Sequence, residues 1–204
     1  MTNSQLSLLE IEPSISDQKI VDFYPNFLSQ TEADALLIAS QNLEWQQNSI
    51  KMFGKPILNP RLEAIYGDNG CDYSYSGVLL SVSPWVDCLK DLRDRIELFT
   101  GYQYHIVIGN RYRDGKDSIG WHSDKQSSLG LNPAIASISL GVTRKFSVKP
   151  RQGGEVQHFD LEHGSLILMH SGCQTTHVHQ VPKQLKVTEE RINWTFRPHI
   201  NGQH

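Results

Sequence analysis

The sequence predicts an α+β domain in which amphipathic helices pack on the outside of a double-stranded β-helix of the jelly-roll or cupin type. Helical periodicity is confined to the first half of the chain, whereas residues 105–197 hold short alternating segments separated by turns. Many short strands joined by turns are typical of closed or sandwiched β-structures. With 204 residues, 38% of them hydrophobic, the chain can bury a sizeable core, so we expect a single domain over 1–204.

The two expected helices carry different signals. Ser29-Gln30-Thr31-Glu32 has the form of a capping box, and the apolar residues that follow at helical spacing are Ala35, Leu36, Ala39 and Leu43. They predict a helix of about 14 residues packed on a sheet. A second helix is expected from Pro84, with a stop at Gly101 and an apolar face formed by Trp85, Leu89, Leu92, Ile96 and Phe99.

The expected strands alternate apolar and polar residues between turn signals. They cover residues 105–112, 134–140, 145–149, 156–161, 165–170, a segment near 178, and 191–197. Asp114-Gly115 predicts a turn after the first of these strands, and residues 151–154 predict a hairpin tip. Residues 1–20 are expected to form a flexible N-terminal segment.

Composition argues against several classes of protein. No stretch approaches the roughly 18 apolar residues of a membrane span, and the first twenty residues lack the features of a secretory or transit peptide. The spacing of Cys71, Cys88 and Cys173 fits neither a zinc site nor a disulfide framework. We therefore expect these three cysteines to be free and to pack as small buried hydrophobic side chains. An intracellular protein is expected, in the cytoplasm or nucleoid, or in the nucleus of a eukaryote, and nothing demands more than a monomer.

The formal net charge of −3 is unevenly distributed along the chain. Residues 1–50 hold seven acidic residues against one base, and the remainder carries 18 bases and 15 acids. A locally basic face is therefore compatible with the negative total, but charge alone does not indicate a nucleic-acid partner.

A candidate metal site begins at His122 and Asp124. Residues two apart on a strand project from the same face, so this His-x-Asp pair places an imidazole beside a carboxylate. His179 lies 57 residues downstream, with several expected strands between, a separation that can bring distant strands side by side in an antiparallel roll. Two histidines and one carboxylate suit Fe(II), because they leave coordination positions open for a co-substrate and oxygen.

A second His-x-Asp pair, His158 and Asp160, is a weaker candidate. The histidines at comparable range downstream of it are His199 and His204, both in a polar tail. We therefore expect His158 to be a surface or turn residue.

Arg191 and Arg197 lie on the last expected strand, downstream of the three candidate ligands. Two guanidinium groups could hold a dicarboxylate by paired hydrogen bonds. The alternative is a pair of exposed strand arginines. Together with the candidate iron ligands, they favour an oxygenase that depends on Fe(II) and 2-oxoglutarate.

Several motifs occur in a fixed order along the chain. They are Asn110-Arg-Tyr112, Asp114-Gly115, His122-x-Asp124, Pro133–Gly141, His163-Gly-Ser165, His179-x-x-Pro182 and Arg191-x-Asn193-x-Thr195-Phe-Arg197. From about residue 50 to residue 198 the chain resembles the AlkB family of 2-oxoglutarate-dependent nucleic-acid demethylases. The resemblance implies that His122, Asp124 and His179 bind iron and take part in catalysis, and that 2-oxoglutarate contacts Asn110, Tyr112, Arg191, Asn193 and Arg197.

Other segments resemble the branch of the family that acts on duplex DNA. Met52-Phe53-Gly54-Lys55 matches a hairpin whose aromatic residue fills the gap left by a flipped base, and the flanking lysines could bind phosphates. From the residues alone, Met52 and Phe53 could equally enter the core of an ordinary hairpin or loop. Tyr73, Tyr75 and Ser76 match positions that line the flipped-base pocket, with Tyr75 stacking opposite His122.

The remaining candidate substrate contacts are less specific. Arg61 belongs to the same turn-rich stretch, so that residues 45–80 form a candidate nucleotide-recognition segment before a catalytic core at 105–198. Gln126 stands where the family often has an acid that contacts the damaged base, which puts the base preference in doubt. The basic run 144–151 could grip phosphates or form a solvated hairpin.

The resemblance implies oxidative demethylation of N-alkylated bases, of the 1-methyladenine and 3-methylcytosine type, with Fe(II), 2-oxoglutarate and O2 as cofactors. Formaldehyde and succinate would be released, and DNA, duplex or single-stranded, would be the partner, with RNA a further candidate. Three alternatives stay open: an oxygenase of the same fold acting on RNA, protein or a small molecule, an inactive nucleic-acid binding module, and a structural β-barrel.

Overall fold

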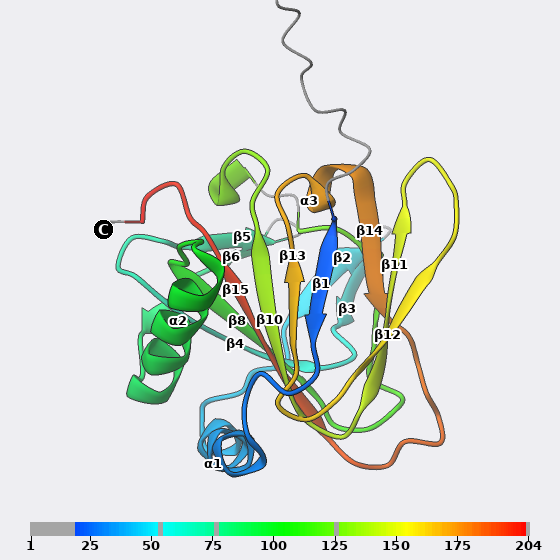
Figure 1. The fold of residues 1–204 in the computed structure, drawn as a ribbon, viewed down its shortest axis with the longest axis horizontal. Helices are drawn as coiled ribbons and strands as arrows, with labels where there is room; N and C mark the ends of the chain where they lie inside the picture. Colours follow the sequence, from blue (N-terminus) through cyan, green and yellow to red (C-terminus); the bar gives the residue numbers. More distant parts are fainter. Residues whose placement is uncertain (1–18, 53–54, 76–77, 125–126, 203–204) are drawn as a thin grey trace, which may run out of the picture.

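The computed structural model describes residues 19–52, 55–75, 78–124 and 127–202. Two antiparallel sheets face each other, as expected for a double-stranded β-helix (Figure 1). In spatial order the larger sheet contains β1 (Val21–Tyr24), β13 (Leu166–Met169), β10 (Ile135–Gly141), β15 (Arg191–Arg197), β8 (Ile106–Tyr112), β4 (Leu62–Gly67) and β7 (Ser83–Pro84), of which only β7 runs parallel to its neighbour. The smaller sheet contains β12 (Gln157–Leu161), β11 (Arg144–Pro150), β14 (His177–Val181) and β9 (Ile119–His122).

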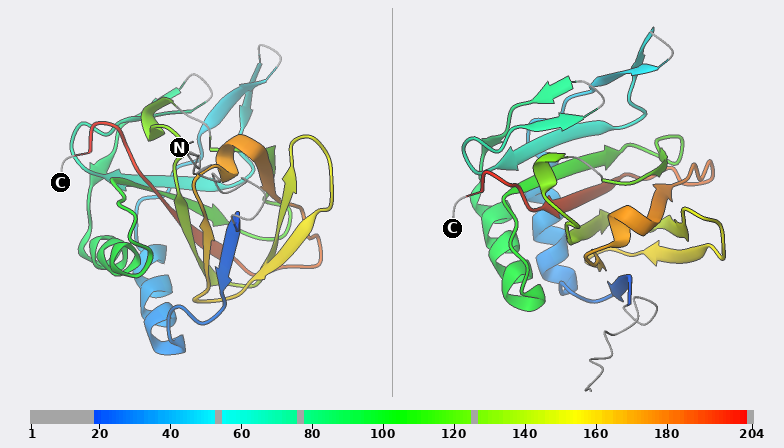
Figure 2. Two further views of the ribbon diagram at one scale, coloured as in Figure 1. Left: turned by 45° about the horizontal axis from the view of Figure 1, so that its top comes forward. Right: turned by 90° about the horizontal axis from the view of Figure 1, so that it is seen from above.

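Two small hairpins extend from the sandwich. One consists of β2 (Ser49–Met52) and β3 (Lys55–Leu58), and the other of β5 (Tyr73–Tyr75) and β6 (Val78–Leu80). Figure 2 shows both on the same side of the molecule, beyond β4. All seven strands expected in the second half are present, and the six that were expected with bounds begin and end within one residue of them.

Helix α1 (Gln30–Gln41) begins at the predicted capping box. The Ser29 backbone N–H donates to Glu32 Oε2 at 2.8 Å, and the Glu32 N–H donates to Ser29 Oγ at 3.4 Å. The predicted apolar face was wrong in part, because the helix buries Ala33, Leu36 and Ser40 and leaves Ala35 exposed. A serine occupies the core because its hydroxyl accepts a hydrogen bond from the Trp194 indole at 2.8 Å.

Helix α2 (Asp87–Thr100) ends where predicted. Gly101 adopts φ 74°, the left-handed conformation that favours glycine, and its N–H donates to Glu97 O at 2.8 Å. Leu89, Leu92 and Ile96 are buried, but the predicted role of Phe99 in the core was wrong: it is half exposed at the end of the helix, against Tyr24 and Phe27.

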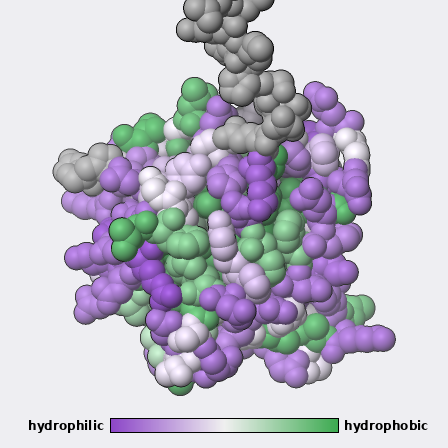
Figure 3. All heavy atoms as spheres, in the orientation of Figure 1, coloured by the Kyte–Doolittle hydropathy of each residue, from purple (hydrophilic) through white to green (hydrophobic). Residues whose placement is uncertain are grey.

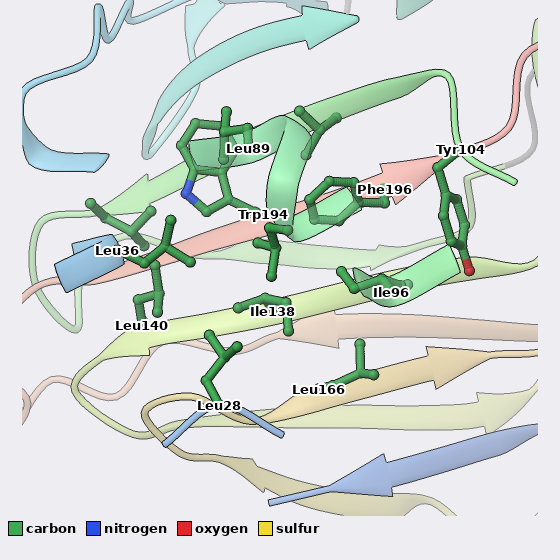
Figure 4. Close-up of a cluster of buried hydrophobic side chains, with 14 of the residues drawn as sticks. Leu28, Leu36, Leu89, Ile96, Tyr104, Ile138, Leu140, Leu166, Trp194 and Phe196 are labelled. Atoms are coloured by element: carbon green, nitrogen blue, oxygen red, sulfur yellow. The ribbon is translucent and has the colours of Figure 1, made fainter. Parts of the chain in front are cut away.

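The main core lies between the larger sheet and the two helices. Figure 4 shows Ile138 and Leu140 of β10 and Trp194 and Phe196 of β15 projecting toward Leu89 and Ile96 of α2 and Leu36 of α1. A second apolar cluster, which includes Ile135, Phe146, Val148, Ile167 and Met169, fills the space between the two sheets. Figure 3 shows hydrophobic side chains near the middle of one face and hydrophilic ones around its edge.

Several smaller expectations can be compared with the structure. Cys71 and Cys173 are buried, Cys88 is half-buried, and all three are free. His158 is exposed as expected, although it lies in β12 rather than in a turn. The expectation of a polar tail was wrong for His199, which is 6% exposed. Its backbone N–H donates to His105 Nδ1 at 3.0 Å. No helix among the described residues is long and apolar enough to span a membrane.

Candidate metal and co-substrate site

Strand pairing brings the three candidate metal ligands together. His122 on β9 lies directly opposite His179 on β14, and Asp124 follows β9 by two residues. One ligand atom from each of these residues lies within 4.8 Å of the other two, and the two imidazole centroids are 4.3 Å apart. These residues are the one such group among the described parts of the chain.

Neighbouring hydrogen bonds set which atoms of His122 and Asp124 face the site. Gly120 O accepts from His122 Nδ1 at 2.9 Å, which leaves Nε2 free for a metal. Arg197 donates to Asp124 Oδ2 from Nη2 at 2.8 Å and from Nε at 3.1 Å. The other oxygen, Oδ1, lies 3.6 Å from His122 Nε2. His122 Nε2 and Asp124 Oδ1 are therefore the atoms left to bind a divalent cation.

The electrostatics keep these groups in metal-binding form. Burial lowers the pKa of His179 to about 3 and also lowers the pKa of His122, so both imidazoles are neutral near pH 7. Burial alone would raise the pKa of Asp124, but the positive charge of Arg197 and its hydrogen bond to the carboxylate reduce it to about 2. Two neutral imidazoles and a carboxylate are a donor set that suits Fe(II).

Arg191 is a buried cation without an anionic partner among the described residues. It is 1% exposed, and its Nε and Nη1 have no hydrogen-bond partner there. Its Nη2 donates to Ser139 Oγ at 2.8 Å, and its guanidinium carbon lies 5.3 Å from the centre of the Tyr112 ring. Burial lowers the pKa of Arg191 to about 10, which leaves it charged. An unpaired buried cation is costly, so this position is suited to an anionic ligand.

A cavity joins Arg191 to the metal-ligand group. It is lined by His122, Asp124 and His179 from the smaller sheet side and by Asn110, Tyr112, Arg191, Asn193 and Arg197 from the larger sheet. Asn193 of β15 lies opposite Asn110 of β8, and both residues line the cavity. All eight residues expected at the iron and co-substrate positions therefore border one cavity.

Sequence reasoning missed other residues of this cavity. Glu63 of β4 lines it and is only 6% exposed, and Arg61, expected to contact nucleic acid, is 5% exposed between Glu63 and Asn110. Gln174 is not part of the cavity lining, but its side-chain oxygen accepts a hydrogen bond from the Asp124 backbone N–H at 2.9 Å. The alternation of β4 was a usable signal for Glu63, since Glu63 and Ile65 share one strand face and both line the cavity.

Only some of the candidate nucleic-acid contacts lie among the residues that the structure describes. Phe53, Ser76 and Gln126 lie outside the described residues, as does His204. For Met52, Tyr73 and Tyr75 the structure describes the backbone only, in β2 and β5. Lys55 is exposed at the start of β3.

The basic run 144–151 is neither a uniform phosphate-binding surface nor a solvated hairpin. Arg144 is fully buried, and it donates to the main-chain oxygens of Asp114, Asp117 and Pro182. Arg144 therefore holds loops together. Lys149 Nζ lies 4.3 Å from the centre of the Trp121 ring, and exposed Arg151 donates to the Ser123 hydroxyl.

Comparisons with known proteins agree with this geometry. The 2OG-Fe(II) oxygenase superfamily profile matches residues 21–197. Among solved structures, a prolyl hydroxylase from Trichoplax adhaerens, in complex with a hypoxia inducible factor peptide, has a TM-score of 0.61 at 13% identity over 88% of this chain and 83% of that one. A structure described as OsALKBH1 has a TM-score of 0.60 at 18% identity over 88% of this chain and 98% of that one. These two likenesses concern the fold alone.

Curated relatives are more similar in sequence. The DNA oxidative demethylase ALKBH2 of Bos taurus is 40% identical over 156 residues, which make up 72% of this chain and 56% of that protein. The alpha-ketoglutarate-dependent dioxygenase alkB homolog 3 of Homo sapiens is 36% identical over 199 residues, or 92% of this chain and 69% of that protein. The chain thus spans between about half and two thirds of the length of these relatives. It belongs to the 2OG-Fe(II) oxygenase superfamily and, within it, to the AlkB family.

Proposed function

We propose that the chain is an Fe(II)- and 2-oxoglutarate-dependent dioxygenase that oxidatively demethylates N-alkylated bases in DNA, of the 1-methyladenine and 3-methylcytosine type. The observation that carries the oxygenase proposal is the buried Arg191, which has no anionic partner among the described residues and lies in the same cavity as the His122, Asp124 and His179 group. A metal-ligand group with open positions and a separate carboxylate-binding cation are what this co-substrate requires.

The residues present fit the iron and the co-substrate. His122 Nε2, Asp124 Oδ1 and His179 would hold the metal, and Arg191 would pair with the distal carboxylate of 2-oxoglutarate through the donors that lack partners. Asn110, Tyr112, Asn193 and Arg197 would complete the co-substrate pocket. When bound, these cofactors supply oxidation by O2, with 2-oxoglutarate converted to succinate and CO2.

The chain's own residues bind, orient and exclude water. Arg197 holds Asp124 in place, and Phe146 packs against His179 with ring centroids 5.3 Å apart, which shields the imidazole from solvent. Hydroxylation of an N-methyl group held beside this site would release formaldehyde and leave the repaired base. A methylated Watson–Crick nitrogen is buried in a duplex, so the base must be extruded first, and damaged pairing lowers that cost.

The DNA substrate is supported by the relatives and by the two hairpins. ALKBH2 of Bos taurus is described as a DNA oxidative demethylase, and it is 40% identical to this chain over 156 residues. Within a single domain, residues 45–80 would form the recognition segment and 105–198 the catalytic core, acting as a monomer. The hairpin β2–β3, with Lys55 exposed, would contact the nucleic acid.

The test is a demethylation assay after anaerobic purification. Fe(II) and 2-oxoglutarate are added, 1-methyladenine oligonucleotides are supplied as single and double strands, and mass spectrometry follows exposure to air. Loss of one methyl group that depends on both additions, and that is absent in His122→Ala, supports the proposal. If 2-oxoglutarate is turned over while every oligonucleotide stays methylated, the result would indicate an oxygenase that acts on another substrate, such as RNA, protein or a small molecule. Oligonucleotide binding without any succinate would indicate an inactive binding module.

A further inference from the structure

The carboxylate of Glu63 holds both ends of the β2–β3 hairpin. Its Oε2 accepts hydrogen bonds from Asn48 Nδ2 at 3.1 Å and from Asn59 Nδ2 at 2.9 Å. Asn48 precedes β2 and Asn59 follows β3, and the Asn59 N–H donates to Asn48 O at 2.8 Å. One carboxylate oxygen of Glu63, a residue that is 6% exposed, therefore fixes the base of the hairpin to strand β4.

The other oxygen of Glu63 is linked through Arg61 to Asn110, and all three residues line the cavity. Arg61 Nη2 donates to Glu63 Oε1 at 2.7 Å, and Arg61 Nε donates to Asn110 Oδ1, also at 2.7 Å. A guanidinium can only donate, so the atom of Asn110 that faces Arg61 is the carbonyl oxygen. The remaining polar atom of this amide, Nδ2, is a donor, which is the group that a carboxylate ligand requires.

We propose that Glu63 and Arg61 are positioning residues that couple the β2–β3 hairpin to the co-substrate pocket through Asn110. This inference rests on the proposed function, in which Asn110 binds 2-oxoglutarate and the hairpin meets nucleic acid. Buried polar networks are strongest when every member is satisfied, so order at one end supports order at the other. Coupling of this kind is reciprocal: a ligand on Asn110 steadies the hairpin, and a held hairpin strengthens ligand binding.

The first measurement is the affinity for 2-oxoglutarate. Calorimetric titration in the presence of Mn(II), without oxygen, is performed on the full chain and on Glu63→Ala and Glu63→Gln. We expect Glu63→Ala to weaken binding about tenfold, because Arg61 loses its anchor and Asn110 its orientation. Glu63→Gln retains one acceptor oxygen, so its affinity for 2-oxoglutarate should lie between that of the unsubstituted chain and that of Glu63→Ala. Glu190→Gln is the matched control, since Glu190 pairs with Arg111 at 2.7 Å, on the strand β8 that also carries Asn110.

The second measurement is amide hydrogen exchange in peptides that cover residues 46–60. In the unsubstituted chain, Mn(II) with 2-oxoglutarate should slow exchange in this segment beyond the effect of Mn(II) alone. In Glu63→Gln the segment should exchange faster and respond less to 2-oxoglutarate. A residue that merely supports folding would not remove the response to the ligand. Should Glu63→Ala fail to fold, the Glu63→Gln variant decides both measurements.

The outcomes separate this inference from the proposed function. If the unsubstituted chain binds no 2-oxoglutarate, the proposed function fails and the inference fails with it. If it binds and folded Glu63 variants bind within twofold of it, with an unchanged exchange response at 46–60, the inference alone is overturned. Neither measurement uses nucleic acid, so the identity of the methylated substrate has no bearing on the result.

Discussion

Arg197 directs two hydrogen bonds to a single carboxylate oxygen of Asp124, at 2.8 and 3.1 Å, and so leaves the other oxygen to the metal position. Both side chains are buried, with 6% of Arg197 and 5% of Asp124 exposed. A buried guanidinium with two donors on one acceptor fixes that acceptor more firmly than a flexible ammonium can. This contact decides how the carboxylate of the metal site is aimed.

Arg197→Lys should therefore weaken metal binding although it keeps the charge. We expect Fe(II) affinity to fall by about tenfold to a hundredfold, the usual cost of losing a group that orients a metal ligand. Anaerobic equilibrium dialysis against Fe(II) measures it, with Arg113→Lys as control because Arg113 pairs with Asp117 outside the cavity. Unchanged Fe(II) affinity in Arg197→Lys would contradict the assigned role.

Arg191→Met should make the protein without co-substrate more stable. The substitution removes a buried cation that has no anionic partner among the described residues, and it keeps a side chain of similar length. We expect the free energy of unfolding to rise by about 1–3 kcal/mol. Urea denaturation measures this change, and the stabilisation that 2-oxoglutarate gives the unsubstituted protein should disappear. Arg111→Met, at a half-buried ion pair with Glu190, is the control and should show no gain.

The pKa shifts at the metal site predict acid sensitivity in protein stripped of metal. The pKa of His179 is lowered by burial from its ordinary 6.5 to about 3, so below pH 6.5 the unfolded chain takes up a proton that the folded chain does not. Stability must then fall as the pH drops from 6.5 to about 3, by an amount on the order of a few kcal/mol. The pKa of Asp124, lowered from 3.8 to about 2, adds a further loss below pH 3.8.

Urea denaturation at several pH values after treatment with a chelator measures this dependence. His179→Gln should flatten the slope between pH 6.5 and 4, whereas His158→Gln, on an exposed side chain, is the matched control. An equally steep slope in His179→Gln would show that the acid sensitivity arises elsewhere.

Much of the candidate site was predictable because its residue types are chemically restrictive. Two histidines, a carboxylate and two strand arginines have few joint uses, and strand alternation assigns each to a face. The links between Arg61, Glu63 and Asn110 were not predictable. Arg61 and Asn110 are 49 residues apart, and only the antiparallel register of β4 and β8 shows that Glu63 lies opposite Asn110. Without that register, the sequence does not distinguish an Arg61 that is buried beside Asn110 from one that is exposed on the surface.

Helix α1 shows a second limit, because hydropathy patterns misplace a buried serine. The pattern favoured Ala35 and Ala39, but the structure buries Ser40 in contact with the indoles of two tryptophans. Trp194 Nε1 donates to the Ser40 hydroxyl, and Trp45 Nε1 donates to the Ser40 carbonyl oxygen. A serine is favourable at this buried position because its hydroxyl accepts the hydrogen bond of the Trp194 N–H, which would otherwise be unsatisfied.

Ser40→Ala should therefore destabilise the protein although alanine is the better helix former. The substitution removes the acceptor of the buried Trp194 N–H and leaves that donor unpaired, at a cost of about 1–3 kcal/mol. Urea denaturation followed by tryptophan fluorescence measures the change in the free energy of unfolding. The matched control is Ala35→Ser, which places a hydroxyl on the exposed face of the same helix and should cost only about 0.5 kcal/mol. If Ser40→Ala proved as stable as the unsubstituted protein, the indole contact would contribute nothing to α1 docking.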